Sequence, residues 1–314
     1  MNIFVNIILI LSSLVLLALI IAFVCYLLVF YVSPKSRECK EEYDVPKGKI
    51  YEPFYEDMIK WIKEGRTLPH RDISITSFDG LRLYGRYYHF FDGAPIELIM
   101  HGYRGSAERD LSGAIARCRE VGTNVIIVDQ RCGGRSEGRT TTFGIRESRD
   151  CRAWIDYIIN EIDPNAKIII GGVSMGASTV MICAGEELPE NVIGVLADCG
   201  YTSAKAIIKK VMRDIKIPPA LLYPFVRLGA IIYGGFDPEA TAPIDQLKKS
   251  RLPVIFFHGD TDGFVPCYMS RENFEACASE KKRLVIIEGA GHGIAFPVDP
   301  EKYVGAVREF FGKA

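Results

Sequence analysis

The chain has 314 residues, of which 48% are hydrophobic and 25% are charged, and its formal net charge at neutral pH is −1. This charge balance, without any stretch that alternates basic and aromatic residues, gives no reason to expect a nucleic-acid partner. About 280 residues follow an apolar N-terminal segment, and this length suits one large domain with a single core.

The N-terminal segment is the most apolar part of the chain. From Asn2 to Pro34 there is no Lys, Arg, Asp or Glu, and about 20 apolar residues suffice to span a bilayer. A cleaved signal peptide would need a charged start, an apolar core of about 7–15 residues and a small-residue cleavage site, and none of these is evident. We therefore expect residues 1–34 to be a transmembrane anchor in a single-pass membrane protein.

The orientation of this anchor is predicted from the charges that flank it. Lys35, Arg37 and Lys40 follow the apolar segment, whereas only the chain amine precedes it. The positive-inside rule then places the main domain on the cytoplasmic side. Nine cysteines without a pairing pattern or metal-ligand spacing favour the same side, because secreted domains usually pair theirs.

After the anchor, we expect a polar tether over residues 35–50, with no core of its own, and then a domain over residues 51–314. Residues 51–65 have the spacing of an amphipathic helix. Two alternating segments around Asp79-Gly80 predict an antiparallel hairpin. From Pro95 onward, short apolar runs alternate with helical stretches, which predicts a mostly parallel sheet with helices on both faces. The predicted parallel strands cover residues 96–100, 124–128, 167–170, 192–197, 254–257 and 284–287, and the predicted helices cover 108–120, 146–162, 175–184, 270–278 and 300–311.

Residues 201–247 are too many for a crossover of one helix and are predicted to be an inserted cap. Residues 204–217 place Ile207, Ile208, Val211 and Ile215 on one helical face, with five basic residues around the remainder. This is the pattern of a basic amphipathic helix. Two interpretations stay open: a solvated cover for the sheet edge, or a face held against anionic lipid beside an apolar pocket formed by residues 220–233.

Ser174 stands between a β-branched run and a helix-like segment. Its surroundings, Gly172-x-Ser174-x-Gly176, are the sequence form of a nucleophile elbow, in which small residues let the backbone turn tightly enough to present the hydroxyl above the sheet. Ser174 is therefore the candidate nucleophile.

A serine hydroxyl needs a base to take its proton and a third group to orient that base. His292 follows the last predicted strand in a glycine-rich loop, and we interpret the other four histidines as structural. Asp262, in the loop after the preceding strand, is the best-placed carboxylate, with Asp260, Asp198 and Asp129 as its alternatives. The order Ser174, Asp262, His292 is that expected of an α/β-hydrolase.

Further motifs in register with this order resemble the α/β-hydrolase superfamily, within its serine-hydrolase branch of esterases, monoglyceride-lipase-like and S33-peptidase-like proteins. These motifs are His101-Gly102-Tyr103, the segments 129–138 and 258–266, and Gly289-x-Gly291-His292. The resemblance covers residues 73–311 and implies an α/β-hydrolase fold with a helical cap. It also implies an oxyanion hole made by the backbone N–H groups of Tyr103 and Met175.

The function that the resemblance implies is cleavage of carboxylic (acyl) esters by two-step acyl transfer, with Ser174, His292 and Asp262 as the triad. No metal or organic cofactor is expected, and no metal or phosphate motif appears in the sequence. The expected partners are a small-molecule acyl ester, with a lipid-derived ester as one form of it, and the membrane. A serine peptidase or amidase of the same fold and a non-catalytic binding protein stay open as alternatives.

Overall fold

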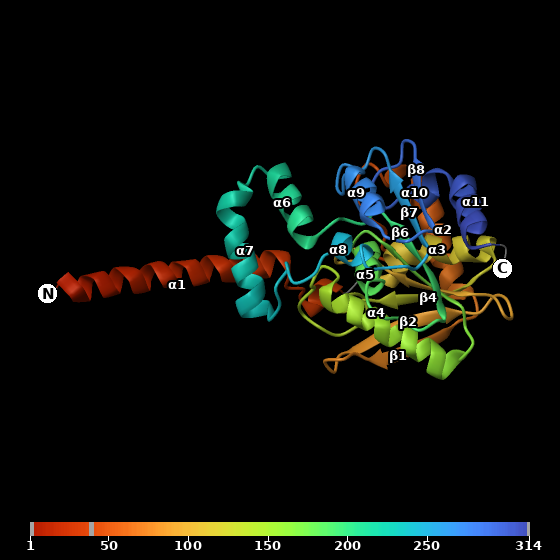
Figure 1. The fold of residues 1–314 in the computed structure, drawn as a ribbon, viewed down its shortest axis with the longest axis horizontal. Helices are drawn as coiled ribbons and strands as arrows, with labels where there is room; N and C mark the ends of the chain where they lie inside the picture. Colours follow the sequence, from red (N-terminus) through yellow and green to blue (C-terminus); the bar gives the residue numbers. More distant parts are fainter. Residues whose placement is uncertain (1–2, 38–40, 313–314) are drawn as a thin grey trace.

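A computed structural model describes residues 3–37 and 41–312, and its centre is an eight-stranded sheet in the order β1-β2-β4-β3-β5-β6-β7-β8 (Figure 1). The pairs β1–β2 and β2–β4 are antiparallel, and every other pair is parallel. The predicted hairpin and the predicted parallel sheet are both confirmed. The strands are β1 (Arg71–Thr76), β2 (Arg82–Tyr88), β3 (Ile96–Met100), β4 (Asn124–Asp129), β5 (Ile168–Val173), β6 (Val192–Asp198), β7 (Val254–Gly259) and β8 (Lys282–Ile287).

Helices cover both faces of the sheet, because successive side chains of its buried strands point to opposite sides. In β5, Ile168 and Ile170 pack on the face that carries α4, α5, α8 and α9, whereas Ile169 packs on the face of α2, α10 and α11, beside α3. These helices are α2 (Tyr55–Thr67), α3 (Ala107–Val121), α4 (Ile145–Tyr157), α5 (Met175–Cys183), α8 (Pro243–Leu247), α9 (Tyr268–Ala276), α10 (Ala295–Val298) and α11 (Pro300–Phe311), with short helical turns η1 (Pro34–Arg37), η2 (Glu52–Phe54) and η3 (Ile158–Ile162).

The segment predicted to be a tether contacts the core of the domain. Val45 is buried in the core beside Met58 and Ile62 of α2, and Tyr43 packs against the same cluster. The polar composition of the segment hid these contacts, because a single apolar residue between charged ones gives no periodic signal.

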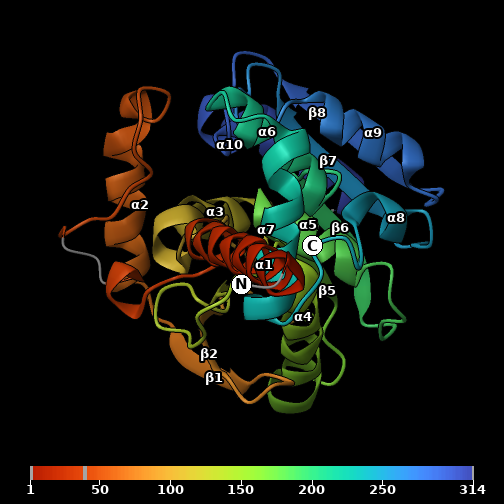
Figure 2. The same ribbon diagram turned by 90° about the vertical axis from the view of Figure 1, so that its left-hand side faces the viewer.

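Helix α1 (Ile3–Val29) projects from the domain, and it is the one helix of the described residues that is long and apolar enough to cross a membrane (Figure 1). Helix α7 (Pro219–Gly234) crosses the carboxyl-terminal third of α1 (Figures 1 and 2). The two backbones approach closely, since a Cβ atom on Gly229 would lie 2.2 Å from the carbonyl oxygen of Ala22. The end of α1 is thus built into the folded domain.

The cap consists of α6 (Ala204–Asp214) and α7, and its basic helix departs from the predicted arrangement. Ile207 and Ile208 are buried as expected, but α6 ends at Asp214, so Ile215 lies beyond the helix and is 60% exposed. Two of its basic residues form ion pairs within the protein, Lys205 with Glu239 and Lys210 with Asp214. Helix α7, which contains most of the residues predicted to line an apolar pocket, packs against α1 and α6.

Candidate active site

Ser174 lies at the tight turn between β5 and α5, as the elbow motif predicts. Its backbone has φ 58° and ψ −116°, a conformation that non-glycine residues rarely adopt. The two flanking glycines are sterically required. A Cβ atom on Gly172 would lie 2.2 Å from the carbonyl carbon of Gly176, and one on Gly176 would lie 2.0 Å from the carbonyl oxygen of Met100.

The fold brings the three predicted catalytic side chains into one hydrogen-bonded row. His292 Nε2 lies 2.9 Å from Ser174 Oγ, and His292 Nδ1 lies 2.7 Å from Asp262 Oδ2. The loop after β8 presents the imidazole, and Gly289 and Gly293 in this loop have positive φ values of 74° and 68°. The distances are those of hydrogen bonds that allow proton transfer from the serine to the histidine.

Asp262 is held as an anion. Its Oδ1 accepts the backbone N–H groups of Phe264 and Val265 at 2.8 and 2.9 Å, while Oδ2 faces both His292 and His258. Burial by itself would raise the pKa of Asp262, but the hydrogen bonds and charges of the two histidines lower it well below its usual range. The carboxylate therefore remains ionised next to the imidazole at neutral pH.

The alternative carboxylates lie elsewhere. Asp260 is exposed and accepts the backbone N–H of Gly289 at 2.7 Å. Asp198 is buried and accepts the Tyr303 hydroxyl at 3.2 Å. Neither is hydrogen-bonded to His292 within the described residues, so the geometry favours Asp262.

The other buried histidines have structural partners. His258 bonds to Ser270 Oγ through Nδ1 and donates to the carbonyl of Val265 through Nε2. His101 accepts the backbone N–H of Gln130. Both rings hold loops at the carboxyl edge of the sheet, as the sequence interpretation expected.

The two N–H groups expected in the oxyanion hole flank Ser174. Tyr103 follows β3, the strand beside β5, and Met175 begins α5. Neither backbone N–H donates to an acceptor within residues 3–37 and 41–312. Two unused donors beside a serine hydroxyl suit an oxygen atom that becomes negatively charged.

A cavity of about 680 Å³ opens at Ser174 and His292. It runs between the sheet and helices α2, α3, α10 and α11, not beneath the cap. Apolar residues form most of its wall, and the segment 46–51 covers one side. Its lining includes Ile50, Met58, Trp61, Ile99, Leu196 and Phe296. Sequence reasoning missed this wall, because its residues come from distant segments whose patterns only indicate helix or tether.

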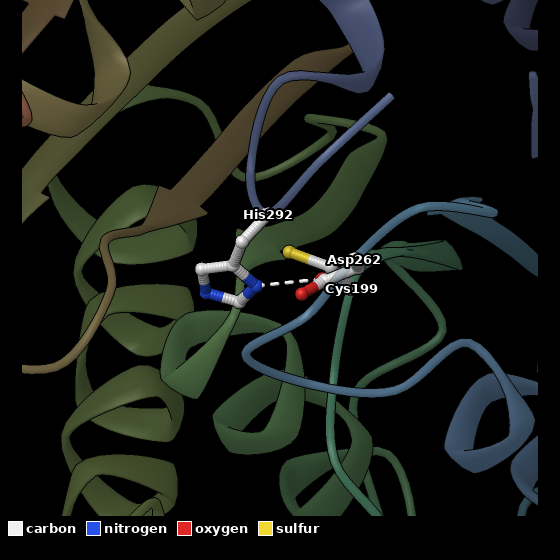
Figure 3. A group of neighbouring side chains, drawn as sticks. All are labelled: Cys199, Asp262 and His292. Atoms are coloured by element: carbon white, nitrogen blue, oxygen red, sulfur yellow. Dashed lines mark hydrogen bonds and ion pairs between the residues drawn. The ribbon is translucent and has the colours of Figure 1, made fainter. Parts of the chain in front are cut away.

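Cys199 lies beside Asp262 and His292 (Figure 3). One ligand atom from each of these residues lies within 4.8 Å of the others, so together they form a potential three-ligand metal site. Burial raises the pKa of Cys199 well above its usual value, and a protonated thiol is a poor metal ligand. The Asp262 carboxylate is already used by the imidazole, so the arrangement suits proton transfer better than metal binding.

Comparison with known proteins finds one group of relatives by sequence and another by fold. No family model matches the sequence. The uncharacterised protein YqkD of Bacillus subtilis is 27% identical over 192 residues, which are 61% of this chain and 63% of YqkD. The match therefore spans less than two thirds of that relative.

Two solved structures superpose over most of the chain. The esterase Pf2001 of Pyrococcus furiosus has a TM-score of 0.64 at 22% identity, covering 86% of this chain and 97% of the esterase. The alpha/beta hydrolase GrgF of Penicillium sp. sh18 has a TM-score of 0.62 at 17% identity, covering 78% and 98% respectively. At identities this low, the similarity shows that the three proteins share a fold.

Proposed function

We propose that this chain, which has the α/β-hydrolase fold, is a serine hydrolase that cleaves carboxylic esters through an acyl-enzyme intermediate. The observation that carries the proposal is the row Ser174–His292–Asp262, with hydrogen bonds of 2.9 and 2.7 Å. The esterases among the structural neighbours support the same class of reaction.

In the proposed mechanism, His292 Nε2 takes the proton of Ser174 as Oγ attacks the ester carbonyl. The Asp262 anion fixes the proton on Nδ1 and stabilises the imidazolium that forms. The N–H groups of Tyr103 and Met175 stabilise the oxyanion. His292 then protonates the leaving alcohol, and water releases the acyl group by the same steps.

The cavity indicates the kind of ester. Its volume of about 680 Å³ falls within the range of about 300–1,000 Å³ for small-molecule sites. Since apolar side chains form most of the wall, we propose an acyl or aryl ester with a medium-sized apolar group as the substrate.

The test uses the full chain in detergent micelles. A fluorophosphonate probe should label wild type on Ser174. The hydrolysis rate of p-nitrophenyl esters from acetate to laurate should be highest at one acyl chain length. Matched amides, tested in parallel, distinguish an esterase from a peptidase or amidase. If wild type neither reacts with the probe nor hydrolyses any of these substrates above the Ser174→Ala rate, the chain is not a serine hydrolase.

We propose further that α1 anchors the protein in a membrane. Its 27 residues span about 40 Å, which exceeds the hydrocarbon thickness of about 30 Å. A signal sequence would be removed, but Phe30 at the end of α1 is fully buried in the domain. The mature protein is therefore expected to keep residue 3, and intact mass measurement of the membrane-extracted chain checks this.

The level of the bilayer follows from the position of α7. Helix α1 is free of the domain up to about Leu17, a length of about 22 Å that is shorter than the hydrocarbon layer. The bilayer boundary then falls at α7, whose outer side carries Leu221, Ile231 and Ile232 at 70%, 45% and 48% exposure. We propose that this apolar side rests in the lipid interface, so that the catalytic domain stays close to the membrane surface.

We place the catalytic domain on the cytoplasmic side. Lys35 and Arg37 follow α1, and Lys40, the third basic residue of that prediction, lies outside the described residues. The eight cysteines within the described ranges are all free, as is usual in a reducing compartment. Protease protection in sealed inverted vesicles, in which the domain should be digested from outside, tests this orientation.

A further inference from the structure

The carboxyl end of α1 contacts the loop that carries one of the two proposed oxyanion donors. The Tyr103 hydroxyl donates to the carbonyl of Val29 at 2.6 Å. The Arg104 guanidinium donates to the carbonyls of Leu28 and Tyr31 at 3.0 and 2.9 Å. The last carbonyls of a helix lack partners inside it, and here Tyr103 and Arg104 supply partners for two of them.

A second set of contacts fixes the same end of α1 from the other side. Phe30 is fully buried and packs edge-to-face on Phe143 and Phe236, with ring centroids 5.7 and 5.2 Å away. The Phe143 ring in turn packs on Tyr103 at 5.1 Å. The Tyr103 side chain is therefore held both by the backbone of α1 and, through Phe143, by Phe30.

Short strand-like contacts complete this attachment. The carbonyl of Phe30 accepts the N–H of Thr141 at 3.0 Å, and the N–H of Val32 donates to the carbonyl of Arg139 at 2.9 Å. The Tyr26 hydroxyl and Thr140 Oγ1 are 2.7 Å apart. Residues 26–32 thus fit into the domain as one of its internal elements, although they continue directly from the apolar helix.

The loop itself needs external support. Arg104 has a φ of 52°, a left-handed conformation that a non-glycine residue keeps only where its surroundings hold it. The base of the loop is fixed by Asp110, which accepts the N–H of Gly102 at 3.1 Å, and by the bond from the Gly105 N–H to the Gly102 carbonyl. The apex at Tyr103 and Arg104 is fixed by α1.

From these contacts we propose that the carboxyl end of α1 is a positioning element for the oxyanion loop, so that the membrane anchor is also part of the catalytic unit. The inference rests on the proposed function, because it assigns the Tyr103 N–H to the oxyanion. The side chain of Tyr103 takes no part in the chemistry, but its bond to Val29 sets where its own N–H points. Loosening this bond should weaken binding of the transition state more than binding of the substrate.

A matched pair of variants in the full chain tests the proposal. Tyr103→Phe removes the hydroxyl that donates to Val29 and keeps the backbone N–H. Tyr233→Phe is the control, because its hydroxyl donates to the α1 carbonyl of Leu19 at 3.1 Å but lies on α7. Both variants lose one bond to α1, and only the first loses a bond at the oxyanion loop.

The measurements are kcat and KM for a p-nitrophenyl ester and Ki for a trifluoromethyl ketone, which forms an oxyanion on Ser174. Loss of a whole oxyanion donor costs about 10²–10³ in kcat, so a displaced donor in Tyr103→Phe is expected to lower kcat by about tenfold or more. Ki should rise in parallel while KM and the thermal midpoint stay near wild type. Tyr233→Phe should keep the wild-type kcat, KM, Ki and thermal midpoint. Phe30→Ala, if it folds, should act as Tyr103→Phe does.

The outcomes separate the inference from the proposed function. Wild-type kcat and Ki in Tyr103→Phe, or equal losses in Tyr103→Phe and Tyr233→Phe, would overturn the positioning role while the esterase assignment stands. A wild-type chain that hydrolyses no ester and does not bind the ketone would overturn the proposed function instead. If Phe30→Ala does not fold, Tyr103→Phe and Tyr233→Phe still decide whether α1 positions the loop at Tyr103.

Discussion

The two flanks of Ser174 are built in different ways. On the flank of β5 to β8, the proposed nucleophile, acid and histidine lie in loops that follow strands, and glycines and backbone hydrogen bonds fix their positions. On the flank of β3 and α3, hydrogen bonds between side chains and residues far away in the sequence fix the positions. Tyr103 and Arg104 bond to α1, and Arg117 of α3 bonds to Glu97 of β3.

The two flanks therefore have different proposed roles, one in the reaction itself and one in positioning a backbone N–H group. The first flank supplies the side chains of the proposed triad, and its geometry follows from local turns. The second flank supplies the backbone N–H of Tyr103, whose place depends on elements that meet only in the folded chain. Changes on the first flank should therefore abolish turnover without unfolding the protein, whereas changes on the second should alter stability or the quality of the site.

The largest effect is expected from Ser174→Ala. The variant removes the nucleophile and keeps the tight turn, since serine and alanine face the same backbone strain at φ 58°. Loss of a triad nucleophile lowers kcat on the order of 10⁶-fold. Ester hydrolysis and circular dichroism, measured on the same preparation, check this. Substantial residual activity in a folded variant would refute Ser174 as the nucleophile.

The next effect is expected from Asp262→Asn. The amide cannot fix the proton on His292 Nδ1, and the equivalent change in a serine triad lowers kcat about 10⁴-fold. Asp260→Asn is the matched control, because an amide oxygen can still accept the N–H of Gly289. It should remain close to wild type. The reverse order of the two variants would identify Asp260 as the acid.

Asp262 also predicts a pH dependence of stability. Its pKa is lowered in the folded protein, so its ionised form stabilises the fold above the unfolded value of about 3.9, and this contribution is lost as the pH falls below it. Thermal midpoints measured between pH 6 and pH 3 should fall more steeply for wild type than for Asp262→Asn. If the thermal midpoints of wild type and Asp262→Asn fall equally with pH, the ionised Asp262 carboxylate does not stabilise the fold as its hydrogen bonds indicate.

The two flanks also differ in how far the sequence predicts them. The elbow, Asp262 and His292 are each defined by residue types at short spacing next to a strand end, so local patterns suffice. The bond from Tyr103 to Val29 joins residues 74 positions apart, and neither segment carries a pattern that indicates the other. The cap shows the same limit. Ile215 fits a helical period, but the chain leaves the helix at Asp214, shortly before Pro218, and proline disfavours helix in the residue that precedes it.

The last prediction sharpens the comparison on the second flank, because it concerns stability and not turnover. Arg117 and Glu97 form an ion pair of 2.7 Å with side chains that are 5% and 0% exposed, and Thr123 Oγ1 donates to the same carboxylate at 2.8 Å. Arg117→Met would leave Glu97 buried without its counter-charge. Breaking a buried pair in this way costs about 3–5 kcal/mol of unfolding free energy.

The control is the exposed pair of Arg283 and Glu309, which has a similar distance of 2.6 Å but 42% and 70% exposed side chains. Arg283→Met should cost less than about 1 kcal/mol, because solvent screens the charges. Urea unfolding of the full chain in micelles measures both. The double variant Glu97→Leu/Arg117→Met should recover much of the loss, since a neutral pair leaves no unpaired charge in the core. If Arg117→Met and Arg283→Met cost the same, the buried ion pair between β3 and α3 stabilises the fold no more than the exposed pair does.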